Sequence, residues 1–120
     1  MTWYPREDLI VYIHDEQIRK YGGRMGFHRD PSLLSAILKE TRKYEGDIYQ
    51  KAAFLLKEIV TAHVFEDGQH RTAFVTVEMF LRQNGETLYY RDYREAQRFL
   101  KRVHEHTLGE IAAWLRHGHP

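Results

Sequence analysis

The sequence contains no cysteine, only three prolines and no long apolar run, and each absence excludes a class of protein. Without cysteine the chain has neither a disulfide framework nor a thiolate zinc site. No apolar stretch approaches the roughly 20 residues that a membrane-spanning helix needs, so we expect no membrane association. The first residues lack the basic head and apolar body of a signal peptide, which favours a cytoplasmic protein.

An excess of charge of one sign is also missing. The 120 residues include 18 Lys and Arg against 17 Asp and Glu, a formal net charge of +1. This balance argues against binding to nucleic acid through bulk electrostatics. With 42% hydrophobic and 29% charged residues, the composition is typical of a globular protein. The length fits one domain, which we expect to cover residues 1–120.

The spacing of apolar residues and the signals at helix ends predict about six helices with short connections, which is an all-α fold. The first helix covers residues 5–21 and ends at two glycines. Asp30 and Pro31 open the second helix as N-cap and first helical residue. Asp47 caps the third helix, which we expect to end near His63.

Three further helices follow this one. The fourth covers about residues 69–83, and residues 87–90 then form either a short strand or a loop. Asp92 and Thr107 are each followed three residues later by a glutamate, the capping-box pattern that predicts the last two helices. We expect the fifth helix to continue through Val103.

The segment 63–72, His-Val-Phe-Glu-Asp-Gly-Gln-His-Arg-Thr, joins the third and fourth predicted helices. His63 extends the inward face of the third helix and can take a proton from a hydroxyl near neutral pH. Gly68 precedes a helix whose first amides lack intrahelical partners and can bind phosphate. Arg71 can bind phosphate oxygens bidentately, and Asp67 can hold a magnesium ion. Together these residues predict phosphoryl or nucleotidyl transfer.

The same segment resembles the loop motif of the Fic/Doc (Fido) family, His-x-Phe-x-Asp/Asn-Gly/Ala-Asn-Lys/Gly-Arg. It is most similar to the death-on-curing (Doc) branch, which has Lys where the Fic branch has Gly. Residues 13–16, 29–34, 49–56 and 111–115 also resemble that branch, so the likeness covers nearly the whole chain. The resemblance implies an all-helical Fido bundle with its active loop between the third and fourth helices.

This resemblance also implies roles for individual residues. His63 matches the catalytic base, Asp67 matches the magnesium-binding or target-contacting acid, and Phe65 matches the aromatic that anchors the loop. The phosphate-binding residues of the family correspond to Gly68, Gln69, His70 and Arg71. The implied donor is ATP or another nucleoside triphosphate, used with Mg²⁺.

The Doc branch implies a toxin of a toxin–antitoxin system, restrained by an antitoxin protein. Such a toxin transfers a phosphoryl group to a hydroxyl of a target protein of the translation-factor type. Fic enzymes instead transfer a nucleoside monophosphate, and they carry a second arginine where this chain has Phe74. Gln69 and His70 stand where the motif has Asn and Lys. The alternatives are therefore an AMP or NMP transferase, or a degenerate Fido protein that only binds a nucleotide or a partner.

Simpler interpretations remain open for several of these residues. His63 can satisfy the last carbonyls of a helix, Asp67 can belong to a simple turn, and Arg71 can be a solvated arginine. A two-metal phosphohydrolase needs a ligand histidine before a His-Asp pair, and no histidine precedes His14-Asp15. We interpret that pair as part of a helix surface or as a support behind the loop.

Overall fold

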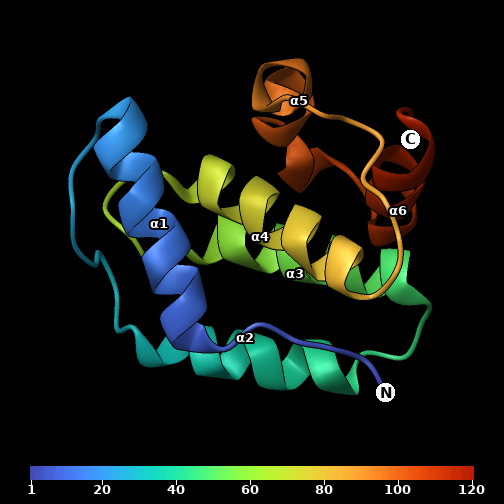
Figure 1. Cartoon of the computed structure of the whole chain (residues 1–120), viewed down its shortest axis with the longest axis horizontal. Coiled ribbons are helices and arrows are strands. Elements are labelled where there is room, and N and C mark those ends of the chain that lie inside the picture. The colour runs from blue at the N-terminus through green and yellow to red at the C-terminus, as the bar shows by residue number, and fades with distance from the viewer.

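The computed structural model describes all 120 residues, and it confirms the all-α prediction with six α-helices, one short 3-10 helix and no strand (Figure 1). The elements are α1 (Glu7–Tyr21), α2 (Ser32–Lys43), α3 (Ile48–Ala62), α4 (Gln69–Gln83), α5 (Tyr93–Leu100), η1 (Val103–Glu105) and α6 (Leu108–His117).

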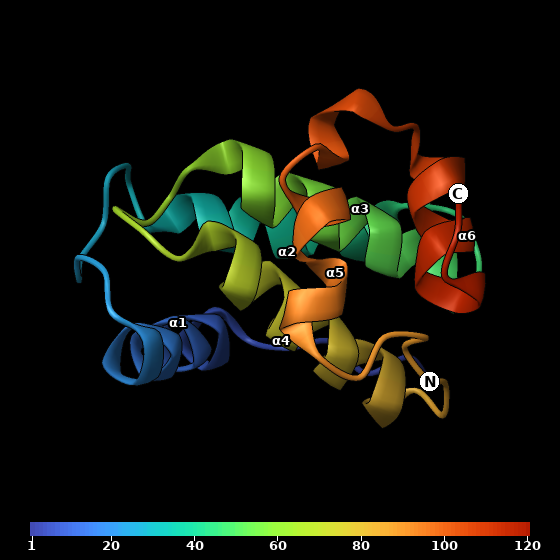
Figure 2. The same ribbon diagram turned by 90° about the horizontal axis from the view of Figure 1, so that it is seen from above.

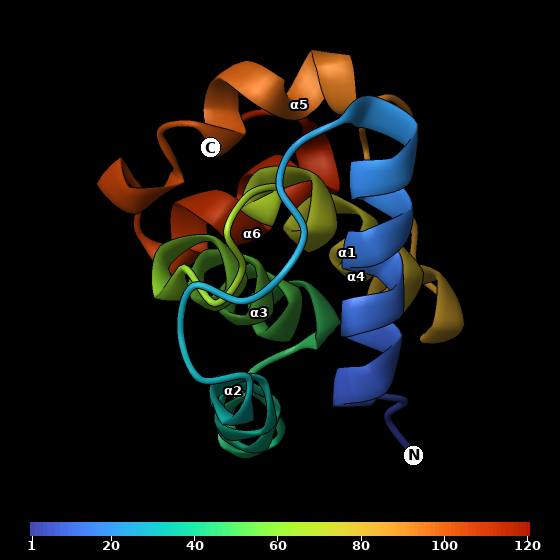
Figure 3. The ribbon, with the colours of Figure 1, turned by 90° about the vertical axis from the view of Figure 1, so that its left-hand side faces the viewer.

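The helices α3 and α4 lie side by side through the middle of the molecule (Figures 1 and 2). The helix α3 also packs against α2, η1 and α6, while α4 packs against α1 and α5. Their apolar faces meet in one core cluster of 25 buried residues. This arrangement brings the α3–α4 loop beside the α1–α2 loop, and Figure 3 shows the two loops next to each other.

Two predicted helix starts form complete capping boxes. In α3, the Asp47 carboxylate accepts from the Gln50 amide at 2.9 Å, and the Gln50 side chain accepts from the Asp47 amide at 2.8 Å. Thr107 and Glu110 make the equivalent pair at the start of α6. Each box satisfies two backbone donors that a helix start leaves without intrahelical partners. The sequence pattern therefore located both starts.

Two helix ends differ from the sequence predictions. The helix α2 begins at Ser32, although Asp30 still caps its start by accepting from the Ser32 amide at 2.9 Å. Residues 87–90 form a loop, one of the two predicted forms, and a 2.9 Å bond from the Tyr89 amide to the Leu115 carbonyl holds it to α6. The helix α5 ends at Leu100, and the buried Val103 begins η1 after a break in helical geometry. None of the helices is long and apolar enough to cross a membrane.

Candidate active site

The α3–α4 loop is fixed to the α1–α2 loop by backbone hydrogen bonds. The His28 amide donates to the Val64 carbonyl at 2.8 Å, and the Glu66 amide donates to the Gly26 carbonyl at 3.0 Å. These bonds frame an isolated antiparallel bridge that centres on Phe65 (Figure 3). A segment 36 to 40 residues earlier in the sequence therefore sets the path of the loop.

His63 is the residue at which α3 ends. Its backbone has φ 51° and ψ 47°, the left-handed conformation, and it is the only non-glycine residue with positive φ. This turn rotates the side chain off the helix face, so His63 is exposed. The prediction that His63 extends the inward face of α3 is wrong. Left-handed backbone is rare for residues other than glycine and clusters at functional sites.

The buried side chain of Gln69 connects two parts of the loop. Its amide nitrogen donates to the Phe65 carbonyl at 2.7 Å and lies 3.3 Å from Nδ1 of His63. Because a carbonyl oxygen only accepts, the nitrogen of the amide faces it, and the second amide hydrogen points to His63. Nδ1 of His63 is then an acceptor, which favours the ring form that carries its hydrogen on Nε2.

Phe65 lies in the core with 1% of its surface exposed. Its ring stacks on His14 of α1, with centroids 3.8 Å apart and planes 8° apart, and on Phe27 of the α1–α2 loop at 5.6 Å. These two contacts hold the middle of the loop against the body of the protein.

The start of α4 offers unpaired backbone donors. The amides of residues 68–71 make no hydrogen bond within the protein, and no side chain caps this helix. Gly68 has φ 85°, and a Cβ at this position would lie 3.1 Å from Cδ1 of Ile18. Glycine therefore permits both the turn and its close approach to α1. Free amides and the positive end of the helix dipole favour an anion here.

The carboxylate of Asp67 is only partly available for a cation. Its Oδ2 accepts from the Arg24 amide at 2.7 Å and lies 3.6 Å from the guanidinium of Arg24. Oδ1 has no such partner, and 44% of the side chain is exposed. No group of three or more His, Cys, Asp or Glu side chains can hold a metal ion. Asp67 alone could therefore supply one oxygen ligand, Oδ1, to a magnesium ion, and the other ligands would have to come from a bound nucleotide and water.

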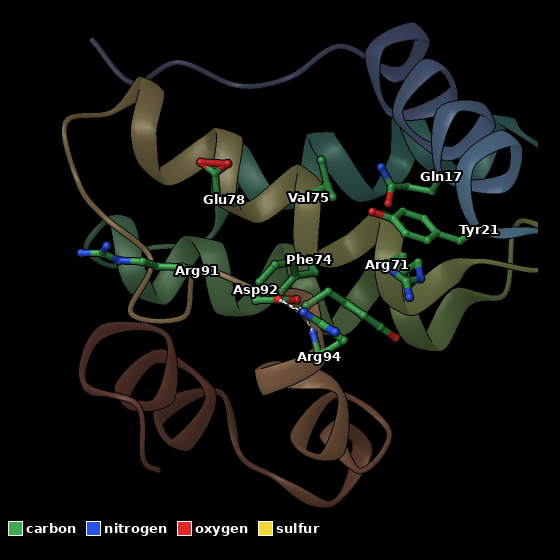
Figure 4. A pocket seen from close by; sticks show the side chains of 10 residues that line it. Gln17, Tyr21, Arg71, Phe74, Val75, Glu78, Arg91, Asp92 and Arg94 are labelled. Atoms are coloured by element: carbon green, nitrogen blue, oxygen red, sulfur yellow. Dashed lines mark hydrogen bonds and ion pairs between the residues drawn. The ribbon is translucent and has the colours of Figure 1, made fainter.

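Arg71, in the first turn of α4, packs against α1 and the start of α5. Its guanidinium lies over the rings of Tyr21 and Tyr93, 3.8 and 4.2 Å from their centroids. Figure 4 shows it beside Tyr21. It lines an open cleft of about 700 Å³ between α1, α4 and the start of α5, to which His63 does not contribute. Arg71 makes no ion pair there, so the edge of the guanidinium is free to bind an anion. Phe74 lines the same cleft and contacts Tyr93 edge to face at 5.8 Å.

If the two tyrosines position Arg71 for phosphate, removing one ring weakens nucleotide binding. We expect Tyr93→Leu to raise KM for ATP about 2- to 30-fold with little change in kcat, since each cation–π contact contributes about 0.5–2 kcal/mol. Tyr93→Phe keeps the ring and should stay near wild type. Tyr89→Leu is the control, since Tyr89 contacts Tyr90 edge to face and is not a ring partner of Arg71. Equal values of KM for the Leu and Phe variants contradict this role.

His70, in the first turn of α4, is half-buried. Burial lowers the pKa of His70, and the nearby His63 and Lys101 lower it further. A histidine whose pKa lies below its ordinary value of about 6.5 is neutral at physiological pH. The ligand-free protein therefore lacks the fixed charge that a lysine gives at this position, and a bound polyphosphate would have to raise the pKa of His70 to recover it.

We therefore expect the affinity for ATP to fall as pH rises above the lowered pKa of His70. His70→Lys should remove this pH dependence and tighten binding at pH 7.5 about 10- to 100-fold, the range of one charge-assisted hydrogen bond. Calorimetric titration between pH 5.5 and 8.5 measures the effect. His104→Lys, at an exposed position of η1, controls for the added charge. Parallel pH curves for His70→Lys and the wild type would exclude a phosphate contact by this residue.

Comparison with known proteins identifies the family of this chain. The model of the Fic/DOC family matches residues 4–81, which include α1 to α4 and the whole loop between α3 and α4. The chain belongs to the Fic/Doc family. It is also similar to "Protein kinase doc" of Escherichia phage P1, with 36% identity over 84 residues, which is 66% of this chain and 65% of that protein. The resemblance to the Doc branch in the sequence is thereby confirmed.

The structure adds residues that the Fic/Doc motif does not include. Tyr21 and Tyr93 enclose Arg71, and Arg24 binds Asp67 through its backbone. The sequence gives no signal for these contacts, since each joins residues more than 20 positions apart. His14, in the His-Asp pair of α1, lies against the loop.

Proposed function

We propose that this protein is a Doc-like toxin that transfers the γ-phosphoryl group of ATP or another nucleoside triphosphate to a hydroxyl of a target protein. The observation that carries the proposal is the α3–α4 loop, which places His63 on an exposed left-handed turn close to the unpaired amides of residues 68–71. A proton acceptor and an anion site lie within one short segment. We further propose that residues 1–120 form one Fido domain.

In this proposal His63 acts as general base. The target hydroxyl gives its proton to the ring, its oxygen bonds to the γ-phosphorus, and the bond from that phosphorus to the bridging oxygen breaks to release the nucleoside diphosphate. The ring must present a lone pair to the hydroxyl. If Nε2 receives the proton, the hydrogen first moves to Nδ1, and the Gln69 contact is lost at a cost of about 1 kcal/mol.

The remaining residues bind and orient the donor. The amides at the start of α4, with His70 and Arg71, surround the phosphates, and Asp67 supplies one oxygen ligand to Mg²⁺. Magnesium neutralises charge on the phosphates when it is bound. Phe65 anchors the loop by packing its ring into the core. Gly68 lets the backbone approach the phosphates because it has no side chain.

The target is proposed to be a protein of the translation-factor class, and the toxin is proposed to be cytoplasmic and restrained by an antitoxin protein. These assignments rest on the similarity to the Doc protein and on the family. AMP transfer is the alternative reaction. The apolar Phe74 at the position of the second Fic arginine disfavours it, because a triphosphate bound in the Fic orientation would lose one charged ligand.

A paired labelling assay tests the reaction directly. The protein is incubated with magnesium and host-cell lysate, with ATP labelled at the γ-phosphate in one tube and at the α-phosphate in the other, and His63→Ala as control. A labelled protein band from the γ tube alone, absent with His63→Ala, supports phosphoryl transfer. Label from the α tube indicates AMP transfer. ATP binding without any label indicates the degenerate alternative that Gln69 and His70 favour.

A further inference from the structure

His14 is a polar side chain in an apolar place. It lies in the middle of α1 with 1% of its surface exposed, and its ring is stacked parallel to Phe65. A phenylalanine would fill the same space without a polar atom. Since burying polar atoms costs free energy unless they are hydrogen-bonded, the partners of the two ring nitrogens indicate what the histidine does here.

Both ring nitrogens have partners. Nε2 lies 2.7 Å from the backbone carbonyl oxygen of Asp67, and Nδ1 lies 3.0 Å from Oδ1 of Asp15. A carbonyl oxygen can only accept, so Nε2 donates. A carboxylate oxygen likewise accepts, so the contact with Asp15 is a hydrogen bond only while Nδ1 carries a hydrogen as well. A Cβ added at Gly68 would lie 3.5 Å from Cδ2 of His14, so the ring packs directly against the turn into α4.

The bond to Asp67 sets the direction of the next amide. The Asp67 carbonyl and the Gly68 N–H belong to one planar trans peptide unit, so they point in opposite directions. While His14 holds the carbonyl toward α1, the Gly68 N–H points away from α1. That N–H makes no hydrogen bond within the protein. If the peptide rotated by half a turn, it would present a carbonyl oxygen to an anion in place of a donor.

The backbone by itself resists such a rotation weakly at this position. Rotating the peptide changes φ of Gly68, and glycine adopts positive and negative φ with similar ease. Gly68 therefore allows the tight turn but does not itself fix the direction of its N–H, which depends on contacts with other residues. Of the side chains packed on the turn, His14 is the one that binds this peptide.

We propose that His14 is a positioning residue that locks the Asp67–Gly68 peptide, so that the Gly68 N–H faces the phosphate of the nucleotide donor. This inference rests on the proposed function for the identity of the ligand. His14 does not touch the reacting atoms and acts through the peptide that it holds.

Substitutions at His14 separate positioning from packing. His14→Phe keeps the ring and the stack on Phe65 but removes the donor. His14→Gln and His14→Met form a second matched pair, because the two side chains have nearly the same shape and only Gln can donate to Asp67. A packing role predicts that Phe is tolerated best. A positioning role predicts that Gln binds nucleotide better than either Phe or Met. If His14→Phe does not fold, the comparison of Gln with Met decides.

The readout is the backbone amide resonance of Gly68 during titration with ATP and Mg²⁺, together with KM and kcat in the labelling assay. We expect the Gly68 resonance to shift in the wild type and His14→Gln. In His14→Phe and His14→Met, we expect an apparent Kd about 10- to 100-fold weaker. KM should rise with it. Equal affinity in all four proteins overturns the inference, as does a Gly68 resonance that ATP does not move in the wild type.

The inference and the proposed function can fail separately. In one case the wild type labels no protein, but its Gly68 resonance shifts with ATP and binding weakens in His14→Phe and His14→Met. The positioning role then stands and the transferase proposal falls. If the wild type labels a protein and His14→Phe labels it with the same KM and kcat, the positioning role falls and the transferase stands.

Discussion

His63→Ala is expected to lower kcat for protein labelling about 10²- to 10⁴-fold, the range over which a positioned general base accelerates proton transfer. Its backbone, with φ 51°, would remain at the end of α3, and because the ring is exposed the variant loses only the 3.3 Å contact with the Gln69 amide nitrogen. The affinity for ATP should change less than about threefold, since the amides of residues 68–71 are still present. The measurements are single-turnover labelling rates and calorimetric binding of ATP.

The matched control is His28→Ala. His28 is also exposed, and its ring lies near the same loop, 3.7 Å from Glu66, but it is outside the family motif. We expect its kcat to stay within about twofold of the wild type. A His63→Ala variant that labels protein as fast as His28→Ala would remove His63 as the base. A variant that loses ATP binding and activity together would assign His63 to donor binding instead.

Phe65→Ala is expected to have the largest effect on stability. Phe65 is 1% exposed, its ring stacks on His14 and on Phe27, and the backbone on both sides of it is hydrogen-bonded to the α1–α2 loop. Truncating a phenylalanine at such a site removes apolar burial and leaves a cavity, which together cost about 3–5 kcal/mol of the free energy of unfolding. Since the loop also loses its anchor, ATP binding should weaken in the fraction that remains folded. Urea unfolding, followed by circular dichroism, measures the change.

Phe27→Ala provides the comparison for this prediction. Phe27 also stacks on Phe65 but is 42% exposed, so its truncation leaves no closed cavity. We expect a loss of no more than about 1.5 kcal/mol. If both variants lose the same free energy of unfolding, the stack as a unit, and not the burial of Phe65, stabilises the loop.

The sequence predicted the helices well wherever the signal was local. Asp47, Asp92 and Thr107 each cap a helix as predicted, and Thr107 with Glu110 forms the predicted capping box, whereas Asp92 accepts from the Arg94 amide and forms none with Glu95. The end of α5 was harder to locate. Val103 continues the apolar spacing of that helix and is buried, but it reaches the core from a 3-10 turn. A periodic apolar pattern predicts which side chains are buried, but it does not predict the backbone conformation at those residues.

For the candidate site, the sequence identified the loop but not the geometry within it. The motif from His63 to Arg71 was recognisable because its polar residues stand at fixed spacing. The left-handed turn that exposes His63, and the pair of rings around Arg71, depend on contacts between distant segments. The contact of Gln69 with His63 is local, but it required the buried position of Gln69 to be known.

The bond between Asp67 and the amide of Arg24 has a consequence for how this protein can change over evolutionary time. The donor is a backbone N–H, which every amino acid except proline provides. Position 24 is therefore free to vary in charge and size while the carboxylate keeps its partner. Mutational scanning of this position should find that most substitutions are accepted, with proline as the exception. Natural selection can then tune the charge next to the candidate anion site without loosening the loop.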